Sequence, residues 1–205
     1  MYKKELDKFF KQNGKYSKIP SACAMFHFKL TAAKGLEKIM PEMHKYIFAE
    51  QPYRKATIGQ KEKEISSLKS ATSVLQHMRR GVDTIVEDAL IQKALEFEKD
   101  LLPEVLKRLR TNKSDFFIEV ALHFLALSKT NWASEWIKEF DNVENPYTQG
   151  YSLVALGNIA DESIVPWLQE KYLELQDGYP DKTYCEGALF GLDLIYSRFY
   201  ENKIK

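Results

Sequence analysis

Residues 152–168 carry the sequence Ser152-Leu153-Val154-Ala155-Leu156-Gly157-Asn158-Ile159-Ala160-Asp161-Glu162-Ser163-Ile164-Val165-Pro166-Trp167-Leu168. An apolar run at helical spacing leads into a short turn of small and acidic residues, and a second apolar run follows with a proline near its start. Proline is tolerated in the first turn of a helix, because the amide protons of that turn have no partner within the helix. The segment therefore predicts two consecutive helices, the second of which begins next to Pro166.

Two marks of this segment recur along the chain at a nearly constant spacing. An apolar pair followed by proline occurs at Pro41, Pro103 and Pro166, which are 62 and 63 residues apart, and Thr72 and Ser134 stand halfway between them. Ala-Leu pairs begin at positions 89, 121, 155 and 188, separated by 32, 34 and 33 residues. A period of about 20–50 residues indicates stacked supersecondary units. The period here fits one pair of helices per unit.

The segment 152–168 resembles the HEAT-like repeat, in the short form also found in phycobilisome lyases. Its Ala155-Leu156-Gly157 run, its turn with Asp161 and its apolar pair before Pro166 stand at the offsets of that family. The resemblance implies a right-handed α-α superhelix, in which antiparallel helix pairs stack into a solenoid. The repeat is structural, so the resemblance implies no catalytic residue and no cofactor.

We predict an all-α protein, since no stretch shows strand alternation bounded by hairpin turns. Residues 1–205 are expected to form a single α-helical repeat domain, with the clearest repeats in 83–202 and a basic, less regular part in 1–82. Few apolar residues anchor the segment near 49–63, and Pro52 breaks any helix that enters it. This segment is expected to be a loop, either a solvated linker or a binding loop. Predicted helix starts are Asp83, Ser114 and Asp181.

Composition places the chain among globular proteins that need no disulfides. Its 205 residues are 44% hydrophobic and 29% charged, which is enough to bury a full core. No apolar run approaches the roughly 18 residues that a membrane span requires, and the first residues lack an apolar signal core. We therefore expect a cytoplasmic protein with no membrane partner, with Cys23 and Cys185 reduced and Cys185 a buried structural thiol.

The formal charge of +1 conceals an asymmetry between the two parts of the chain. Residues 1–81 hold 17 Lys and Arg against 7 Asp and Glu, whereas residues 82–205 hold 13 against 22. Three explanations stay open: attraction between the parts within one molecule, head-to-tail self-association, or a nucleic-acid footprint on the basic part. Lys outnumbers Arg by 24 to 6, which weighs against dedicated phosphate recognition.

Motifs for catalysis and metal binding are missing from the sequence. It holds no glycine-rich phosphate loop, no nucleophile elbow and no zinc-spaced Cys/His set. Glu119 and His123 stand four residues apart, but a metal site needs three or four ligands. HEAT-type deoxyhypusine hydroxylases bind iron through His-Glu dipeptides, and this chain has none. We predict no catalytic residue, no metal and no cofactor, and expect hydrogen-bonded or partly exposed side chains at His27, His44 and His77.

Two groups of residues are candidates for binding a partner. Trp132, Trp136 and Trp167 fit three roles: packing between helices, a protein-binding surface, or a platform for nucleic-acid bases. The acidic residues near them disfavour phosphate. The second group is a basic one that is expected to be either a solvated face or a set of phosphate contacts: Lys34, Lys38, Lys45, Arg54, Lys55, Arg79 and Arg80.

The leading functional prediction is a non-enzymatic HEAT-like scaffold that binds a protein partner, because stacked helices offer an extended surface. The alternative is a nucleic-acid-binding HEAT-like protein, of the kind represented by alkylpurine DNA glycosylases, that uses its basic N-terminal half. Steep salt dependence of duplex binding would distinguish the alternative from the leading prediction.

Overall fold

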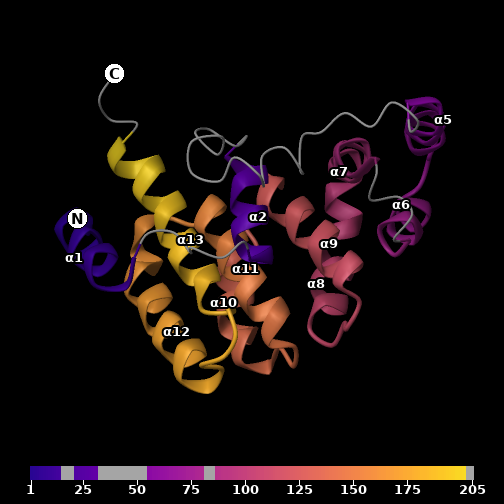
Figure 1. Cartoon of the computed structure of the whole chain (residues 1–205). Coiled ribbons are helices and arrows are strands. Elements are labelled where there is room, and N and C mark those ends of the chain that lie inside the picture. The colour runs from indigo at the N-terminus through magenta and orange to yellow at the C-terminus, as the bar shows by residue number, and fades with distance from the viewer. Residues whose placement is uncertain (15–20, 32–54, 81–85, 202–205) are drawn as a thin grey trace. The chain divides into compact units, whose positions relative to one another are not determined.

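The structure of the protein, a computed structural model, describes residues 1–14, 21–31, 55–80 and 86–201. These residues form eleven α-helices and short helical turns with no strand among them, which confirms the all-α class (Figure 1). Contacts divide the chain into a continuous unit, residues 35–132, and a split unit, residues 1–34 together with 133–205. The single repeat domain over 1–205 and its superhelical arrangement stay predictions.

The continuous unit consists of five described helices: α5 (Lys55–Ser66), α6 (Ala71–Met78), α7 (Glu87–Glu96), α8 (Glu98–Leu109) and α9 (Asp115–Leu127). From α6 to α9, each helix contacts both the next helix and, where there is one, the helix after it. Helix α9 is buried on nearly all sides, as its apolar composition requires. Ser114 occupies its N-cap position as predicted, but the Ser114 side chain makes no capping hydrogen bond. Helix α6 also contacts α9, so each of these four helices touches the other three, an arrangement that is compatible with stacked helix pairs.

The split unit contains the remaining helices. They are α1 (Lys3–Asn13), α2 (Ala22–Leu30), α10 (Ala133–Glu139), α11 (Pro146–Ile159), α12 (Val165–Gly178) and α13 (Glu186–Tyr196), with 3-10 turns at Phe140–Asn142 and Glu162–Ile164 and a π-helical turn at Ser197–Glu201. Helix α13 lies against α11 and α12, and glycines on α11 and α13 allow their backbones to touch.

The segment 152–168 folds as its sequence predicts. Helix α11 ends at Ile159, and the Asp161 carboxylate accepts a hydrogen bond of 2.7 Å from the backbone N–H of Ser163. Helix α12 then begins at Val165 with Pro166 in its first turn. Pro103 differs, because it lies inside α8 rather than in the first turn. Only one residue separates α7 from α8, so α8 starts five residues before this proline.

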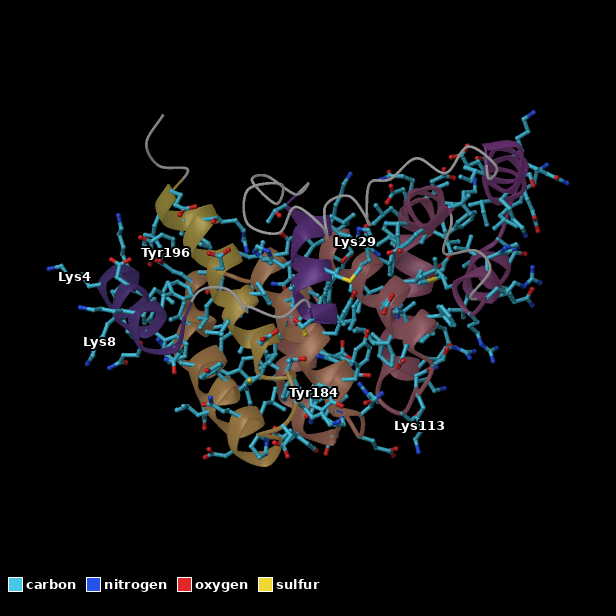
Figure 2. The ribbon with its side chains drawn as sticks, viewed as in Figure 1. Lys4, Lys8, Lys29, Lys113, Tyr184 and Tyr196 are labelled. Atoms are coloured by element: carbon cyan, nitrogen blue, oxygen red, sulfur yellow. The ribbon has the colours of Figure 1, made fainter. Side chains whose placement is uncertain are left out.

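The N-terminal helices pack against the C-terminal ones, which sequential stacking of repeats does not predict. Helix α2 contacts both α11 and α13, and α1 also contacts α13. Phe26 stacks on Tyr151 with ring centroids 4.4 Å apart, and His27 Nε2 lies 2.9 Å from Asp193 Oδ2. On the outer face of α1, Lys4 and Lys8 extend into solvent (Figure 2). Part of the N-terminal sequence thus packs on the C-terminal helices within one molecule.

Two local predictions are wrong. Lys55 to Ser66 form α5 rather than a loop. The sequence has few apolar residues there, but Ile65 is buried and the helix packs against α7, and these contacts stabilise it. Asp181 does not start the last helix; residues 180–185 form turns, and α13 begins at Glu186 after Cys185. Residues 49–54 and Asp83 lie outside the described residues. No helix in the described parts has the length and apolar character for crossing a bilayer.

Candidate functional site

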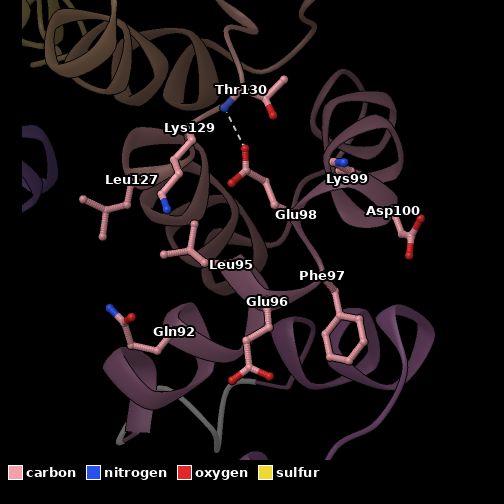
Figure 3. A pocket seen from close by; sticks show the side chains of 10 residues that line it. All are labelled: Gln92, Leu95, Glu96, Phe97, Glu98, Lys99, Asp100, Leu127, Lys129 and Thr130. Carbon is pink, nitrogen blue, oxygen red and sulfur yellow. Dashed lines mark hydrogen bonds between the residues drawn. The ribbon is translucent and has the colours of Figure 1, made fainter.

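A cleft of about 750 Å³ opens in the continuous unit where α7 meets α8 (Figure 3). The last turn of α7, the first turn of α8 and the segment after α9 form its walls. The lining side chains are Gln92, Leu95, Glu96, Phe97, Glu98, Lys99, Asp100, Leu127, Lys129 and Thr130. Its volume falls within the range of about 300–1,000 Å³ that is typical of ligand pockets.

The cleft exists because a single residue joins the two helices. Phe97 ends α7 by donating its backbone N–H to the carbonyl oxygen of Ala94 at 3.0 Å. Its own carbonyl oxygen accepts the backbone N–H of Leu101 at 3.0 Å, which is the first turn of α8. The chain therefore turns sharply, and consecutive side chains from 95 to 100 surround one hollow.

Three apolar side chains give the cleft a hydrophobic part. Leu95 and Phe97 are half-buried, and Leu127 at the end of α9 is 38% exposed. In Figure 3, Leu127, Lys129 and Leu95 lie on one side, and Phe97, Lys99 and Asp100 lie on the other. Exposed apolar groups that gather within a polar rim are typical of interaction sites.

Glu98 connects the start of α8 to the segment after α9 by a hydrogen bond. Its Oε1 accepts the backbone N–H of Thr130 at 2.7 Å, the bond drawn in Figure 3. Burial raises the pKa of the Glu98 carboxyl, but hydrogen bonds from Thr130 and Lys129 and the Lys129 charge outweigh burial, so the pKa is lowered. Glu98 is therefore a fixed negative charge inside the cleft at neutral pH.

The cleft contains charges of both signs, and Lys93, next to its lining, pairs with Glu96 at 2.7 Å. Its lining holds three carboxylates, from Glu96, Glu98 and Asp100, against the ammonium groups of Lys99 and Lys129. Two helices, α7 and α9, end at the cleft, and the C-terminal end of a helix dipole is negative. One helix, α8, begins there, and its acidic first turn offsets its positive end.

A smaller cleft of about 310 Å³ lies next to the first and shares one residue with it. Asp100 lines both clefts, on the exposed side of the first turn of α8. The other lining residues of the smaller cleft are Ala71, Thr72, Leu75, Leu101 and Glu104. Asp100 thus lies where the two hollows adjoin, and the leucines of the smaller hollow are almost completely buried.

The predicted tryptophans do not form an exposed platform. Trp132 and Trp136 are each 1% exposed, and Trp132 Nε1 donates to the carbonyl oxygen of Leu125 at 2.8 Å. Trp167 is half-buried, with its ring edge-on to Phe140 at 5.1 Å between centroids. The packing interpretation is confirmed for Trp132 and Trp136, because helix contacts enclose both rings.

Most of the predicted phosphate contacts lie where the structure describes no side chain. Lys34, Lys38, Lys45 and Arg54 lie outside the described residues, and Lys55 is described only by its backbone at the start of α5. Arg79 and Arg80 are exposed directly after α6. A cation at the C-terminal end of a helix interacts favourably with the helix dipole.

Two of the predicted histidines lie close to glutamate carboxylates. His123 Nδ1 lies 2.7 Å from Glu87 Oε1, and His77 Nε2 lies 3.9 Å from Glu64 Oε1, whereas His44 lies outside the described residues. The described parts of the chain hold no cluster of three or more His, Cys, Asp or Glu side chains able to ligate a metal.

Both cysteines of the chain are free thiols. Cys23 is buried, and Cys185 is only half-buried, which is more exposed than the sequence predicts. Burial raises the pKa of each thiol, and the nearby Glu186 charge raises it further. A raised pKa lowers the thiolate fraction and with it the reactivity of a cysteine.

Comparison of the chain with protein-family models, with curated proteins and with solved structures finds no match. The candidate site is therefore defined by its geometry: two neighbouring clefts, the residues that line them and the carboxylate of Asp100 between them.

Proposed function

We propose that this chain is a non-enzymatic HEAT-like scaffold that binds a protein partner through the cleft between α7 and α8. The observation that carries the proposal is the cleft itself, an open hollow of about 750 Å³ with apolar side chains inside a charged rim. Protein interfaces commonly combine an apolar centre with a polar rim in this way.

The packing of the continuous unit supports a repeat scaffold. The contacts among α6, α7, α8 and α9 are compatible with stacked helix pairs. Stacked repeats bind partner chains over an extended surface. The cleft lies between the ends of α7 and α9 and the start of α8.

The cleft has no excess of positive charge that would favour nucleic acid as its ligand. Its carboxylates from Glu96, Glu98 and Asp100 are matched by Lys99, Lys129 and the Lys93 that pairs with Glu96, so no surplus of cations is left for phosphate contacts. The basic N-terminal part remains the alternative binding surface. A labelled DNA duplex tests it by fluorescence anisotropy at two salt concentrations, since phosphate contacts produce a steep, linear loss of log affinity with log salt.

Site-specific crosslinking tests the proposed cleft directly. Lys99 on the cleft rim is replaced by the photoreactive residue p-benzoylphenylalanine, and Glu170, exposed on α12 of the split unit, is replaced in the same way as a control. We expect irradiation in an extract of the protein's own cells to give a discrete crosslinked protein from position 99 and none from position 170.

A second variant links the crosslink to the cleft. Adding Leu127→Asp places a charge on an exposed apolar group of the cleft and should abolish the crosslink while the circular dichroism spectrum is unchanged. Equal crosslinking from both positions, or a crosslink that survives Leu127→Asp, contradicts the proposal.

A further inference from the structure

We infer that Cys23 and Cys185 form a reversible disulfide, which links α2 to the start of α13, when the protein meets a peroxide. They are the only two cysteines in the chain, and both are free thiols in the structure. The disulfide would lie in the split unit and so does not depend on the proposed function, because the cleft between α7 and α8 belongs to the continuous unit.

The packing of α2 on α13 brings the two cysteines to one place (Figure 1). The His27 ring has its centroid 4.9 Å from that of Phe190, and its Nε2 lies 2.9 Å from Asp193 Oδ2. Cys23 precedes His27 by one helical turn, so it lies on the same face of α2. One turn before Phe190, the chain of α13 is at its first residues, which directly follow Cys185.

A hydrogen bond fixes the register of the two helices at this end. The Cys23 sulfur accepts the backbone N–H of Gly187, so α2 and α13 run in the same direction and Cys23 lies beside the first turn of α13. Cys185 is the N-cap residue of that turn, two positions before Gly187. Burial, and then the charges of Glu186 and Cys185, raise the pKa of the Cys23 thiol, which agrees with a short separation of the two sulfurs.

The difference in exposure determines which thiol reacts first. Cys23 is 4% exposed, whereas Cys185 is half-buried and within reach of a small peroxide. Cys185 loses its proton to water, and its thiolate attacks one oxygen of the peroxide. An S–O bond forms, the O–O bond breaks, and the departing hydroxide takes up a proton to become water. Cys185 then carries a sulfenic acid.

Cys23 completes the reaction as the second thiol. Its sulfur attacks the sulfenic sulfur, so that the S–S bond forms and the S–O bond breaks. The hydroxide leaves with the proton of the Cys23 thiol as a second water. The two thiols together give up two electrons, which reduce one peroxide to two waters. A small thiol reverses the reaction, first by attacking the half-buried sulfur of Cys185 and then, with a second equivalent, by attacking the mixed disulfide.

The surroundings of the thiols make the oxidation slow at neutral pH. Burial, and then the Glu186 charge, raise the pKa of the Cys185 thiol, so few molecules carry the thiolate. The disulfide therefore forms under sustained oxidation, and it forms faster as the pH rises. Once formed, it closes a loop between residues that are 162 positions apart, which restricts the unfolded chain and stabilises the folded one.

Treatment of the full-length protein with hydrogen peroxide at mildly alkaline pH tests the inference. We expect the mass of the unreduced monomer to fall by that of two hydrogen atoms and the titratable thiols to fall from two to none. Dithiothreitol should restore both thiols. The melting temperature of the oxidised monomer should rise by about 5–15 °C, whereas the same treatment of Cys185→Ser should give no rise.

A matched variant tests whether the position of Cys23 is what permits the disulfide. Cys23→Ser combined with Met25→Cys keeps two thiols in the chain and moves one of them two positions along α2, to a half-buried site. Two positions correspond to about 200° around a helix, so the moved thiol faces away from Cys185. We expect the internal disulfide to form at least tenfold more slowly in this variant than in the wild type.

Three results would overturn the inference: disulfide-linked dimers with no internal disulfide, a sulfinic acid on Cys185 beside a free Cys23 thiol, or equal rates in the wild type and the matched variant. An oxidised monomer that melts at the same temperature as the reduced one would also contradict it. None of these results bears on the crosslink from position 99, which tests the proposed function separately.

Discussion

Gly157 of α11 and Gly191 of α13 meet backbone to backbone, so that a Cβ atom on Gly157 would overlap the Cα and carbonyl of Gly191. Gly150 and Gly187 form a second contact of this kind between the same two helices. The helices approach so closely because neither side carries a side chain at these points. Four glycines thus determine how α11 and α13 pack in the split unit.

Replacing Gly157 with Ala should destabilise the protein by about 1–3 kcal/mol, the usual cost of overfilling a packed core. The atoms that the new methyl group meets are backbone atoms, which cannot rotate away. Gly178, the last residue of α12, has nothing within 4 Å of an added Cβ, so Gly178→Ala is the control and should not destabilise. Urea denaturation of both variants measures the difference, and equal midpoints would refute the packing argument.

The buried contact between His27 and Asp193 should be essential for holding α2 on α13. Both side chains are 4% exposed, and their polar atoms lie 2.9 Å apart. Asp193→Ala removes one partner from a buried polar pair and should destabilise by about 1–3 kcal/mol. Urea denaturation of His27→Ala, Asp193→Ala and the double variant measures the coupling between them. Strictly additive losses would show that the contact contributes nothing of its own.

Glu98 should make the stability of the continuous unit depend on pH. Because its pKa is lowered below the ordinary 4.5 in the folded protein, its contribution is complete above that value. The contribution is lost as the pH falls through the folded pKa. Urea denaturation at pH 6 and at pH 4 should therefore show a smaller loss for Glu98→Gln than for the wild type. Glu104→Gln, an exposed change on the same helix, should lose as much as the wild type does.

Arg198 should stabilise the end of α11. Its Nη1 donates to the carbonyl oxygens of Gly157 and Ala160 at 2.7 and 2.9 Å, which satisfies acceptors that the helix itself leaves open. Arg198→Ala should cost about 1–3 kcal/mol, since these hydrogen bonds come from a charged donor. Thermal denaturation followed by circular dichroism measures the loss. An unchanged melting temperature would show that water can replace the guanidinium as a hydrogen-bond donor with no loss of stability.

The sequence predicts helix boundaries that depend on capping residues and proline. Asp161 and Pro166 mark the boundary between α11 and α12, since capping and proline geometry act within a few residues. Helix α5 is not predicted because it contains Gly59 and because, among those of its side chains that the structure describes, only Ile65 is buried. Packing on α7 rather than its own sequence pattern therefore stabilises it. Asp181 shows the reverse case, in which a good cap residue lies in a turn.

The candidate site depends on segments that are far apart in sequence. Phe97 carries no cap signal, and Leu127 looks like an ordinary core residue at the end of an apolar helix. Only the fold brings residues 92–100 next to residues 127–130 and leaves Leu127 partly exposed. Trp132 and Trp136 fill the interior, because large aromatic side chains gain most from burial, whereas Trp167 stays half-buried.

The placement of α2 on α11 and α13 sets an order of events during translation. His27 and Asp193 are 166 residues apart, so the ribosome makes Phe26 and its neighbours long before their native contacts exist. The continuous unit has all of its own residues by Trp132 and is free to fold earlier. The apolar face of the N-terminal segment therefore stays exposed until α13 has been synthesised. Exposed apolar surface of this kind is what chaperones bind during protein synthesis.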